Sequence, residues 1–158
     1  MKYCEQCGQV LDFKVIEDKK IPYCHGCDKL YFPLYAVAVS MIVRYEQQVL
    51  LIQQYQKPYP ILVAGYVNKG EALEAACVRE LKEETNLDAM KVTYLRSKYY
   101  APSNTLMVNF EVMVEHPNFQ LNEEVDAAAF YPLEKALQAM KPTSLAYYFM
   151  KEYLKKRG

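Results

Sequence analysis

Residues 65–87 read GYVNKGEALEAACVRELKEETNL, and this stretch carries most of the information about the fold. Gly65 and Gly70 bracket a short loop, and the residues that follow predict an amphipathic helix over about 72–86. Counted at helical spacing from Leu73, the expected buried stripe contains Ala76, Cys77, Glu80, Glu83 and Glu84. An apolar helix face therefore becomes acidic halfway along its length, which packing alone does not explain.

The three acids of this stripe are Glu80, Glu83 and Glu84, which lie within one helical turn of each other, so we expect their carboxylates on one face. Like charges at this spacing repel, and partial burial adds to the penalty unless a cation or protons are bound. A set of oxygen ligands indicates Mg²⁺ or Mn²⁺, which keep several waters and share substrate phosphates. The alternative is a solvated acidic face, but the apolar start of the stripe favours a metal site.

Two further charged residues lie just before the acids of the helix. Glu71 lies eight positions before Arg79. A carboxylate that reaches a guanidinium can accept two parallel charge-assisted hydrogen bonds. We therefore expect Glu71 to join the loop to the helix and to hold the acids in place.

These residues together resemble the Nudix box, a pattern written G-x5-E-x7-R-E-U-x-E-E-x-G-U, where U is an aliphatic residue. The matching positions are Gly65, Glu71, Arg79, Glu80, Leu81, Glu83, Glu84 and Leu87. Asn86 stands where the pattern has glycine; asparagine adopts the left-handed conformation that ends a helix more readily than other non-glycine residues, so we expect the box to be intact. The resemblance implies an α/β fold, an α/β/α sandwich with a mixed sheet. It also implies a hydrolase of nucleoside diphosphate derivatives, with Glu71, Arg79, Glu80, Glu83 and Glu84 as its catalytic residues.

Four of the five cysteines lie in two pairs, Cys4-x-x-Cys7 and Cys24-x-x-Cys27. Four thiolates at this spacing can surround one Zn²⁺ tetrahedrally, which leaves no position open for a substrate, so the predicted site is structural. We expect Gly8 and Gly26 to permit the tight turns of the two pairs.

The domain boundary is expected at Tyr31-Phe32-Pro33, with a zinc ribbon over residues 1–32 and a Nudix domain over residues 33–158. The hydrophobic patterns after the boundary predict further elements. Strands are expected near 35–44, 48–55, 61–64, 91–99, 106–115 and 128–131, and helices near 133–140 and 145–155.

A cysteine ribbon before a Nudix domain makes the chain similar to the NAD(H) pyrophosphatases of the family over almost its whole length. That group carries the signature S-Q-P-W-P-F-P-x-S, and residues 97–105 are the matching stretch here. Ser97 agrees, but the tryptophan and three prolines are absent. ADP-ribose and flavin adenine dinucleotide therefore stay open as alternative substrates, as does a nucleotide-sensing module without catalysis.

The same resemblance implies further site residues. Glu124 is expected to bind the catalytic metal, with Glu123 as its competitor. The implied substrate-binding residues are Tyr31, Phe32, Ala64, Gly65, Ser97, Lys98, Tyr99, Tyr100 and Ala146. Packing within the linker is an equally good explanation for either ring of the Tyr31-Phe32 pair.

Composition narrows the remaining possibilities. Lys plus Arg (19) balance Asp plus Glu (19), so no overall field attracts nucleic acid; NAD-capped RNA is the exception we keep, through lysines of the ribbon. No apolar run approaches 18 residues and no secretory signal begins the chain, which predicts a cytoplasmic protein without a membrane span. The resemblance implies a homodimer.

Overall fold

The computed structural model describes residues 1–158, which form two compact units, Met1–Tyr35 and Ala36–Gly158. The first unit has one antiparallel sheet in the order β1 (Asp12–Ile16), β2 (Lys19–Cys24) and β3 (Lys29–Leu30). Its small core contains Cys4, Leu11, Cys24 and Tyr31. A core this small is not enough to stabilise a folded segment alone, which is consistent with a structural metal site in this unit.

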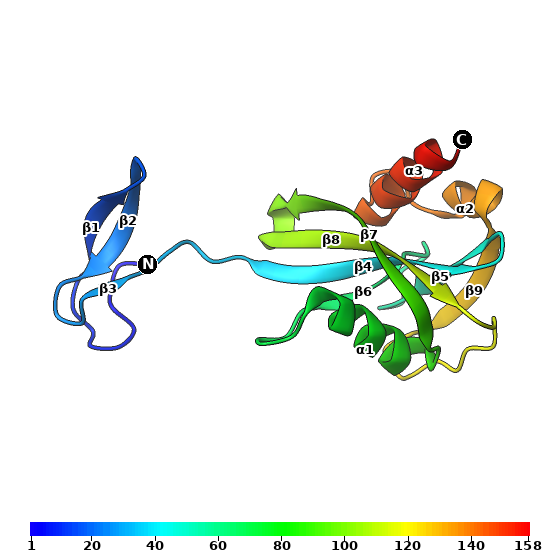
Figure 1. Ribbon diagram of the computed structural model, residues 1–158, viewed down its shortest axis with the longest axis horizontal. Helices are drawn as coiled ribbons and strands as arrows, with labels where there is room; N and C mark the ends of the chain where they lie inside the picture. The colour runs from blue at the N-terminus through cyan, green and yellow to red at the C-terminus, as the bar shows by residue number, and fades with distance from the viewer. The chain divides into compact units, whose positions relative to one another are not determined.

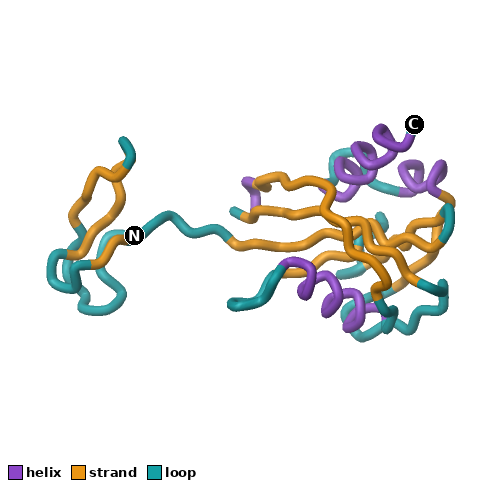
Figure 2. The backbone as a smooth tube through the Cα atoms, viewed as in Figure 1, coloured by secondary structure: helices purple, strands orange, loops and turns teal.

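The second unit is built around a six-stranded sheet in the order β7-β8-β4-β5-β9, with β6 paired to β4 (Figure 2). The strands are β4 (Ala36–Tyr45), β5 (Gln48–Gln53), β6 (Val63–Tyr66), β7 (Ala89–Tyr100), β8 (Thr105–Val114) and β9 (Ala127–Pro132). Only the β4–β8 pairing is parallel. The sheet is therefore mixed, as the Nudix resemblance implies.

Helices cover both faces of this sheet (Figure 1). One face packs against α1 (Leu73–Thr85), and the other against α2 (Leu133–Ala139) and α3 (Leu145–Arg157); a 3₁₀ turn, η1 (Ala101–Ser103), joins β7 to β8. The α/β/α sandwich and the predicted elements are thus confirmed, with element ends shifted by a few residues. No helix is long and apolar enough to cross a membrane.

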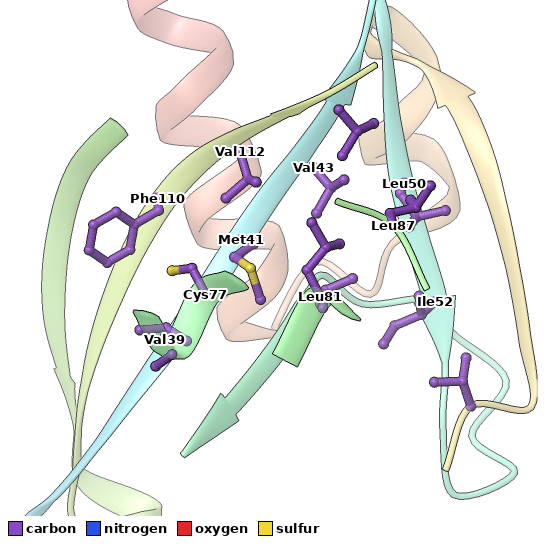
Figure 3. Packing of buried hydrophobic residues seen from close by; sticks show 14 of the residues in the cluster. Val39, Met41, Val43, Leu50, Ile52, Cys77, Leu81, Leu87, Phe110 and Val112 are labelled. Atoms are coloured by element: carbon purple, nitrogen blue, oxygen red, sulfur yellow. The ribbon is translucent and has the colours of Figure 1, made fainter. Parts of the chain in front are cut away.

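Alternation along β4 divides the core into two layers. Val39, Met41 and Val43 pack with Cys77 and the rest of the α1 layer (Figure 3), whereas Ile42 packs under α2 and α3. Cys77 is fully buried, and burial raises the pKa of its thiol to about 12. It is therefore an inert core residue.

The buried face of α1 differs from the predicted stripe at one position. Cys77, Leu81 and Glu84 are buried, whereas the side chain of Glu83 is 55% exposed. Positions 77, 81 and 84 follow the i, i+4, i+7 row at the centre of the face, and residue 83 lies on the row that flanks it. The prediction that all three acids share the buried face was therefore wrong for Glu83.

Asn86 ends α1 in the left-handed conformation (φ 58°, ψ 15°), and its N–H donates to the Lys82 carbonyl at 3.0 Å. The prediction that asparagine replaces the glycine of the Nudix pattern without disturbing the helix end is confirmed. Asparagine can replace the glycine of the pattern here because it tolerates positive φ.

Candidate functional site

The acidic helix lies closely against strand β6 because Gly65 has no side chain. A Cβ at Gly65 would lie 2.0 Å from Cδ of Glu80. No other residue fits there without moving the carboxylate. Glycine at this position therefore brings the Glu80 carboxylate against the backbone of β6.

Arg79 is the centre of a hydrogen-bond network that joins the loop to the helix. Its Nε donates to Oε1 of Glu71 at 2.7 Å, and its Nη2 donates to Oε2 of the same residue at 2.9 Å. The predicted bidentate contact is confirmed. Arg79 also donates to Glu80 at 2.6 Å and to the Tyr66 carbonyl at 3.0 Å, while Glu71 accepts from the Asn68 N–H at 2.9 Å. Three of these hydrogen bonds join the 66–71 loop to the helix, and the Arg79–Glu80 bond connects them to the acids.

The network gives the carboxylates of the site different pKa values. Hydrogen bonds from Arg79 hold the pKa of Glu71 at about 2, so this acid stays ionised. Burial raises the pKa of Glu80, although Arg79 opposes the shift. Glu83 is more exposed and contacts Arg79 at 3.3 Å.

Glu84 is the most deeply buried acid of the site, at 3% exposure. Gln54 donates to its Oε1 at 2.9 Å, but its Oε2 is buried and has no hydrogen-bond partner. Burial raises the pKa of Glu84 to about 7, and the charges of Glu80 and Glu124 add to the shift. A buried acceptor without a donor, in a group of like charges, is an arrangement that a divalent cation would satisfy.

Glu80, Glu84 and Glu124 line one cavity of about 360 Å³. No lysine or arginine borders it. Glu124 comes from the loop before β9, and its backbone N–H is held by the Asn122 side chain at 3.0 Å. Glu123 does not reach this cavity, which favours Glu124 over its neighbour.

The floor of the cavity is a row of paired residues on the α2–α3 side of the sheet. Met107 on β8 pairs with Ala38 on β4, and Ala38 pairs with Tyr66 on β6. Register neighbours project from the same face of a sheet. Met107 packs into the α2–α3 cluster, which identifies the face.

The structure brings only part of the predicted substrate-binding set to this cavity. Ala64 and Gly65 line it. Ser97, Lys98 and Tyr99 lie on β7 and do not; the ammonium of Lys98 is 4.2 Å from the centre of the Tyr148 ring.

Two further members of the set lie toward α3. Tyr100 borders a second cavity beside the start of that helix. Ala146 packs against the α2–α3 cluster and borders neither cavity.

Several residues that line the cavity were not predicted from the sequence. They are Ala38, Gln54, Tyr55, Tyr66, Asn68, Ser103, Thr105 and Met107. Tyr66 directly follows the first glycine of the box, so its place in the motif could have indicated it. Gln54 lies 30 residues from Glu84 and belongs to no motif, so only the fold shows their contact.

The four paired cysteines of the first unit also come together. Their sulfurs all lie within 4.8 Å of one another, with Cys7–Cys24 at 3.5 Å and Cys4–Cys27 at 3.9 Å. Tetrahedral ligation at a Zn–S distance of about 2.3 Å places sulfurs about 3.8 Å apart, so the cluster has the dimensions of a four-thiolate site.

The turns of this cluster differ slightly from expectation. Gly8 follows Cys7 with φ +74°, as predicted, but the equivalent residue after the second pair is Asp28, with φ 48°. Gly26 lies within the second turn but does not adopt positive φ; a Cβ there would lie 2.3 Å from Oε1 of Gln9, so glycine leaves room for that side chain. Asp28 adopts positive φ because short polar side chains tolerate the left-handed region.

Tyr31 belongs to the cysteine cluster. Its hydroxyl lies 2.9 Å from Sγ of Cys4, and its side chain is 9% exposed. The hydroxyl lowers the pKa of the Cys4 thiol to about 6. Phe32 is 54% exposed, so the two aromatic residues of the pair lie in different environments.

An α/β/α sandwich with a carboxylate-bearing helix, clamped to its loop beside a cavity, defines the Nudix class of hydrolases. The NUDIX domain family matches residues 34–152, about three quarters of the chain, and the chain belongs to this family.

Relatives with known names are similar to most of this chain. The NAD-capped RNA hydrolase NudC of Photorhabdus laumondii is 34% identical over 112 residues, which are 69% of this chain and 42% of the relative. The mitochondrial NAD(P)H pyrophosphatase NUDT13 of Mus musculus is 27% identical over 146 residues, which are 89% of this chain and 41% of the relative. The chain therefore spans less than half the length of these relatives.

Solved structures support the fold. A NUDIX hydrolase from Nitrosomonas europaea superposes with a TM-score of 0.72 at 22% identity, covering 99% of this chain and 92% of that one. The NUDIX domain of Shewanella oneidensis NrtR, crystallised with ADP ribose, gives 0.67 at 19% identity, covering 86% of this chain and 94% of that one.

Proposed function

We propose that the protein is a metal-dependent hydrolase of the pyrophosphate linkage in a nucleoside diphosphate derivative, with a dinucleotide such as NAD(H) as its substrate. The observation that carries the proposal is the cavity where Glu80, Glu84 and Glu124 meet, with one buried carboxylate oxygen of Glu84 lacking a donor. The names of the NudC and NUDT13 relatives support the choice of an NAD-like substrate.

The catalytic Mg²⁺ or Mn²⁺ would be held by Glu80, Glu83, Glu84 and Glu124. When bound, such ions neutralise diphosphate oxygens and lower the pKa of a bound water. The chain itself fixes its carboxylates before substrate arrives: Arg79 and Glu71 hold the loop. Preorganised charge of this kind is the main contribution that a protein makes to phosphoryl-group chemistry.

Further residues of the chain orient the reacting groups. Gln54 donates to one oxygen of Glu84 and leaves the other free for a cation. A glutamate near the reacting water accepts its proton, and Glu83 and Glu124 are both candidates. Both are exposed, and Glu83 also has a contact to Arg79.

The cavity floor suits a nucleoside. Ala38 and Met107 offer an apolar surface, and Tyr66 is 59% exposed, so its ring can stack on a base. The remaining substrate-binding predictions stay predictions; these residues are Tyr31, Phe32, Ser97, Lys98, Tyr99, Tyr100 and Ala146.

The cysteine cluster is proposed to hold one structural Zn²⁺. The sulfur separations and the closed four-thiol shell support zinc. We expect about one zinc per chain by metal analysis, released by a thiol-modifying reagent and absent in Cys24→Ser, while the Nudix unit of that variant stays folded. Zinc-free wild-type protein with an ordered ribbon would contradict the proposal.

The proposal also covers the oligomeric state of the protein, its cell compartment and its activity on RNA. Four neighbouring cysteines without a disulfide suit a reducing compartment such as the cytoplasm. We expect a homodimer from the family resemblance, and activity on NAD-capped RNA from the name of the NudC relative.

A substrate panel tests the proposal: NAD⁺, NADH, ADP-ribose, flavin adenine dinucleotide, coenzyme A and nucleoside triphosphates, each with Mg²⁺ or Mn²⁺. We expect metal-dependent release of AMP from NAD(H) that is lost in Glu84→Gln. Glu74→Gln, an exposed acid of the same helix, is the matched control and should retain activity. Turnover of ADP-ribose or flavin adenine dinucleotide instead would establish the alternative substrates, and saturable binding without turnover would establish a nucleotide sensor.

A further inference from the structure

A second cavity of the Nudix unit, of about 460 Å³, has the opposite charge to the acidic one. Its lining includes two lysines, Lys57 and Lys141, and no acid. Neither lysine has a carboxylate within 4.0 Å. Two phenol rings, Tyr59 and Tyr100, border the same space. Cationic groups beside aromatic rings in a cavity of this size suit a phosphorylated nucleoside.

The two cavities share two walls. The first wall is the loop after β5, where Tyr55 borders the acidic cavity and Lys57 borders the basic one. Two residues span at most about 7 Å of chain. The second wall is the end of β7 with the η1 turn that follows it, where Tyr100 borders the basic cavity and Ser103 the acidic one. One ligand with groups on either side of these walls can therefore reach both cavities.

The first wall is held in an unusual backbone conformation. Tyr55 and Gln56 both have φ 55°, in the left-handed region that such residues avoid. Three hydrogen bonds support it: Lys57 N–H to Gln54 O at 3.1 Å, Gln56 N–H to Asp126 Oδ2 at 2.7 Å, and Gln53 Nε2 to the Lys57 carbonyl at 3.3 Å. The fold thus fixes the backbone of Lys57 beside the basic cavity before any ligand binds.

We infer that the basic cavity binds a further phosphate of the substrate, beyond the pyrophosphate that is cleaved. The inference rests on the proposed function, because it assigns the pyrophosphate to the acidic cavity. Lys57 and Lys141 would contact the extra phosphate, which one ribose separates from the pyrophosphate. The preferred substrate is then a dinucleotide with a third phosphate, and two sources share this chemistry: the 2′-phosphate of NADP⁺ and the first phosphodiester of NAD-capped RNA.

Matched substrates test the inference on the full chain. NADP⁺ and NAD⁺ differ by one phosphate, and a short NAD-capped oligoribonucleotide supplies the phosphodiester. We expect kcat/KM to be about tenfold higher for at least one phosphate-bearing substrate than for NAD⁺, since each lysine adds a charge-assisted hydrogen bond. The ratio should fall toward one in Lys57→Ala/Lys141→Ala and as salt concentration rises. Lys135→Ala, an exposed lysine of α2, is the control and should keep the wild-type ratio.

The two substrate arms identify the source of the phosphate. Ratios near one for both phosphate-bearing substrates in wild type, or an unchanged ratio in the double variant, would overturn the inference. Failure of the proposed function is seen separately, as absence of turnover with every dinucleotide. In that case binding decides: wild type should bind adenosine 2′,5′-bisphosphate about tenfold more tightly than AMP, and the double variant should bind both equally. Equal binding by wild type would refute the basic subsite.

Discussion

The buried carboxylate of Glu84 predicts an unusual pH dependence of stability for the metal-free protein. Its pKa is about 7 in the folded chain, above the value of 4.5 for an exposed glutamate. Between these two pKa values the native state binds more protons than the unfolded state, so the unfolding free energy falls as pH rises. Stability from this group is complete below about pH 4.5 and is lost as pH passes through 7.

The size of the effect follows from the shift. One pKa unit corresponds to about 1.4 kcal/mol, so Glu84 lowers the unfolding free energy by about 2.5 kcal/mol between pH 5 and pH 8. For a domain of this size the corresponding loss is roughly 5–10 °C in melting temperature. Glu84→Gln removes the titrating group and should lack this slope. The Gln54 contact survives in that variant, because the glutamine oxygen still accepts it.

Urea unfolding followed by circular dichroism measures the slope, since the chain has no tryptophan to report by fluorescence. Wild type, Glu84→Gln and the control Glu74→Gln are compared in chelator at pH 5 and pH 8. Saturating Mg²⁺ should restore the stability of wild type at pH 8 and have no such effect on Glu84→Gln. Parallel pH profiles for wild type and Glu84→Gln would refute the assignment of a strained, buried charge.

Substitutions at three further positions test other parts of the structure. Glu71→Gln should lower the unfolding free energy at pH 7, measured by urea unfolding, because Arg79 loses a charged partner. Hydrogen bonds from Arg79 lower the pKa of Glu71 to about 2, so the difference from wild type should shrink as pH falls from 4.5 toward 2. Gly65→Ala should keep the fold but weaken Mn²⁺ binding at least tenfold by calorimetry, because the new Cβ would lie 2.0 Å from Cδ of Glu80. Asn86→Gly should change stability by less than about 0.5 kcal/mol, whereas Asn86→Val should cost about 1–2 kcal/mol in the same unfolding assay, because valine resists positive φ; equal stability of the two variants would contradict the left-handed helix end.

The parts of the site that lie within one short segment were predictable from sequence. Glu71 and Arg79 are separated by eight positions on one loop and helix, so local geometry alone brings them together, and their contact has the predicted bidentate form. Glu83 was misplaced because adjacent rows of a helix surface differ by a single residue in the sequence. Burial decides between such rows, and burial depends on the sheet beneath the helix.

The residues that the sequence analysis missed come from separate strands and loops. Gln54 directly follows β5 and meets Glu84 only because the folded sheet packs against α1, and nothing near Gln54 signals the contact. Lys57 and Lys141 are each a single lysine in a loop, and they are 84 positions apart. A cavity assembled by tertiary folding from isolated residues has no periodic pattern that a sequence could display.

Strand β4 contributes side chains both to the hydrophobic core and to the cavity proposed to bind the ligand. Val37, Val39 and Met41 belong to the hydrophobic layer under α1, while Ala38 between them forms part of the cavity floor. A slip of one residue along this strand would reverse every side chain, turning the valines away from the α1 layer and Ala38 away from the cavity. Substrate range can therefore change during evolution through the surrounding loops, whereas insertions and deletions within this strand would remove folding and ligand binding together.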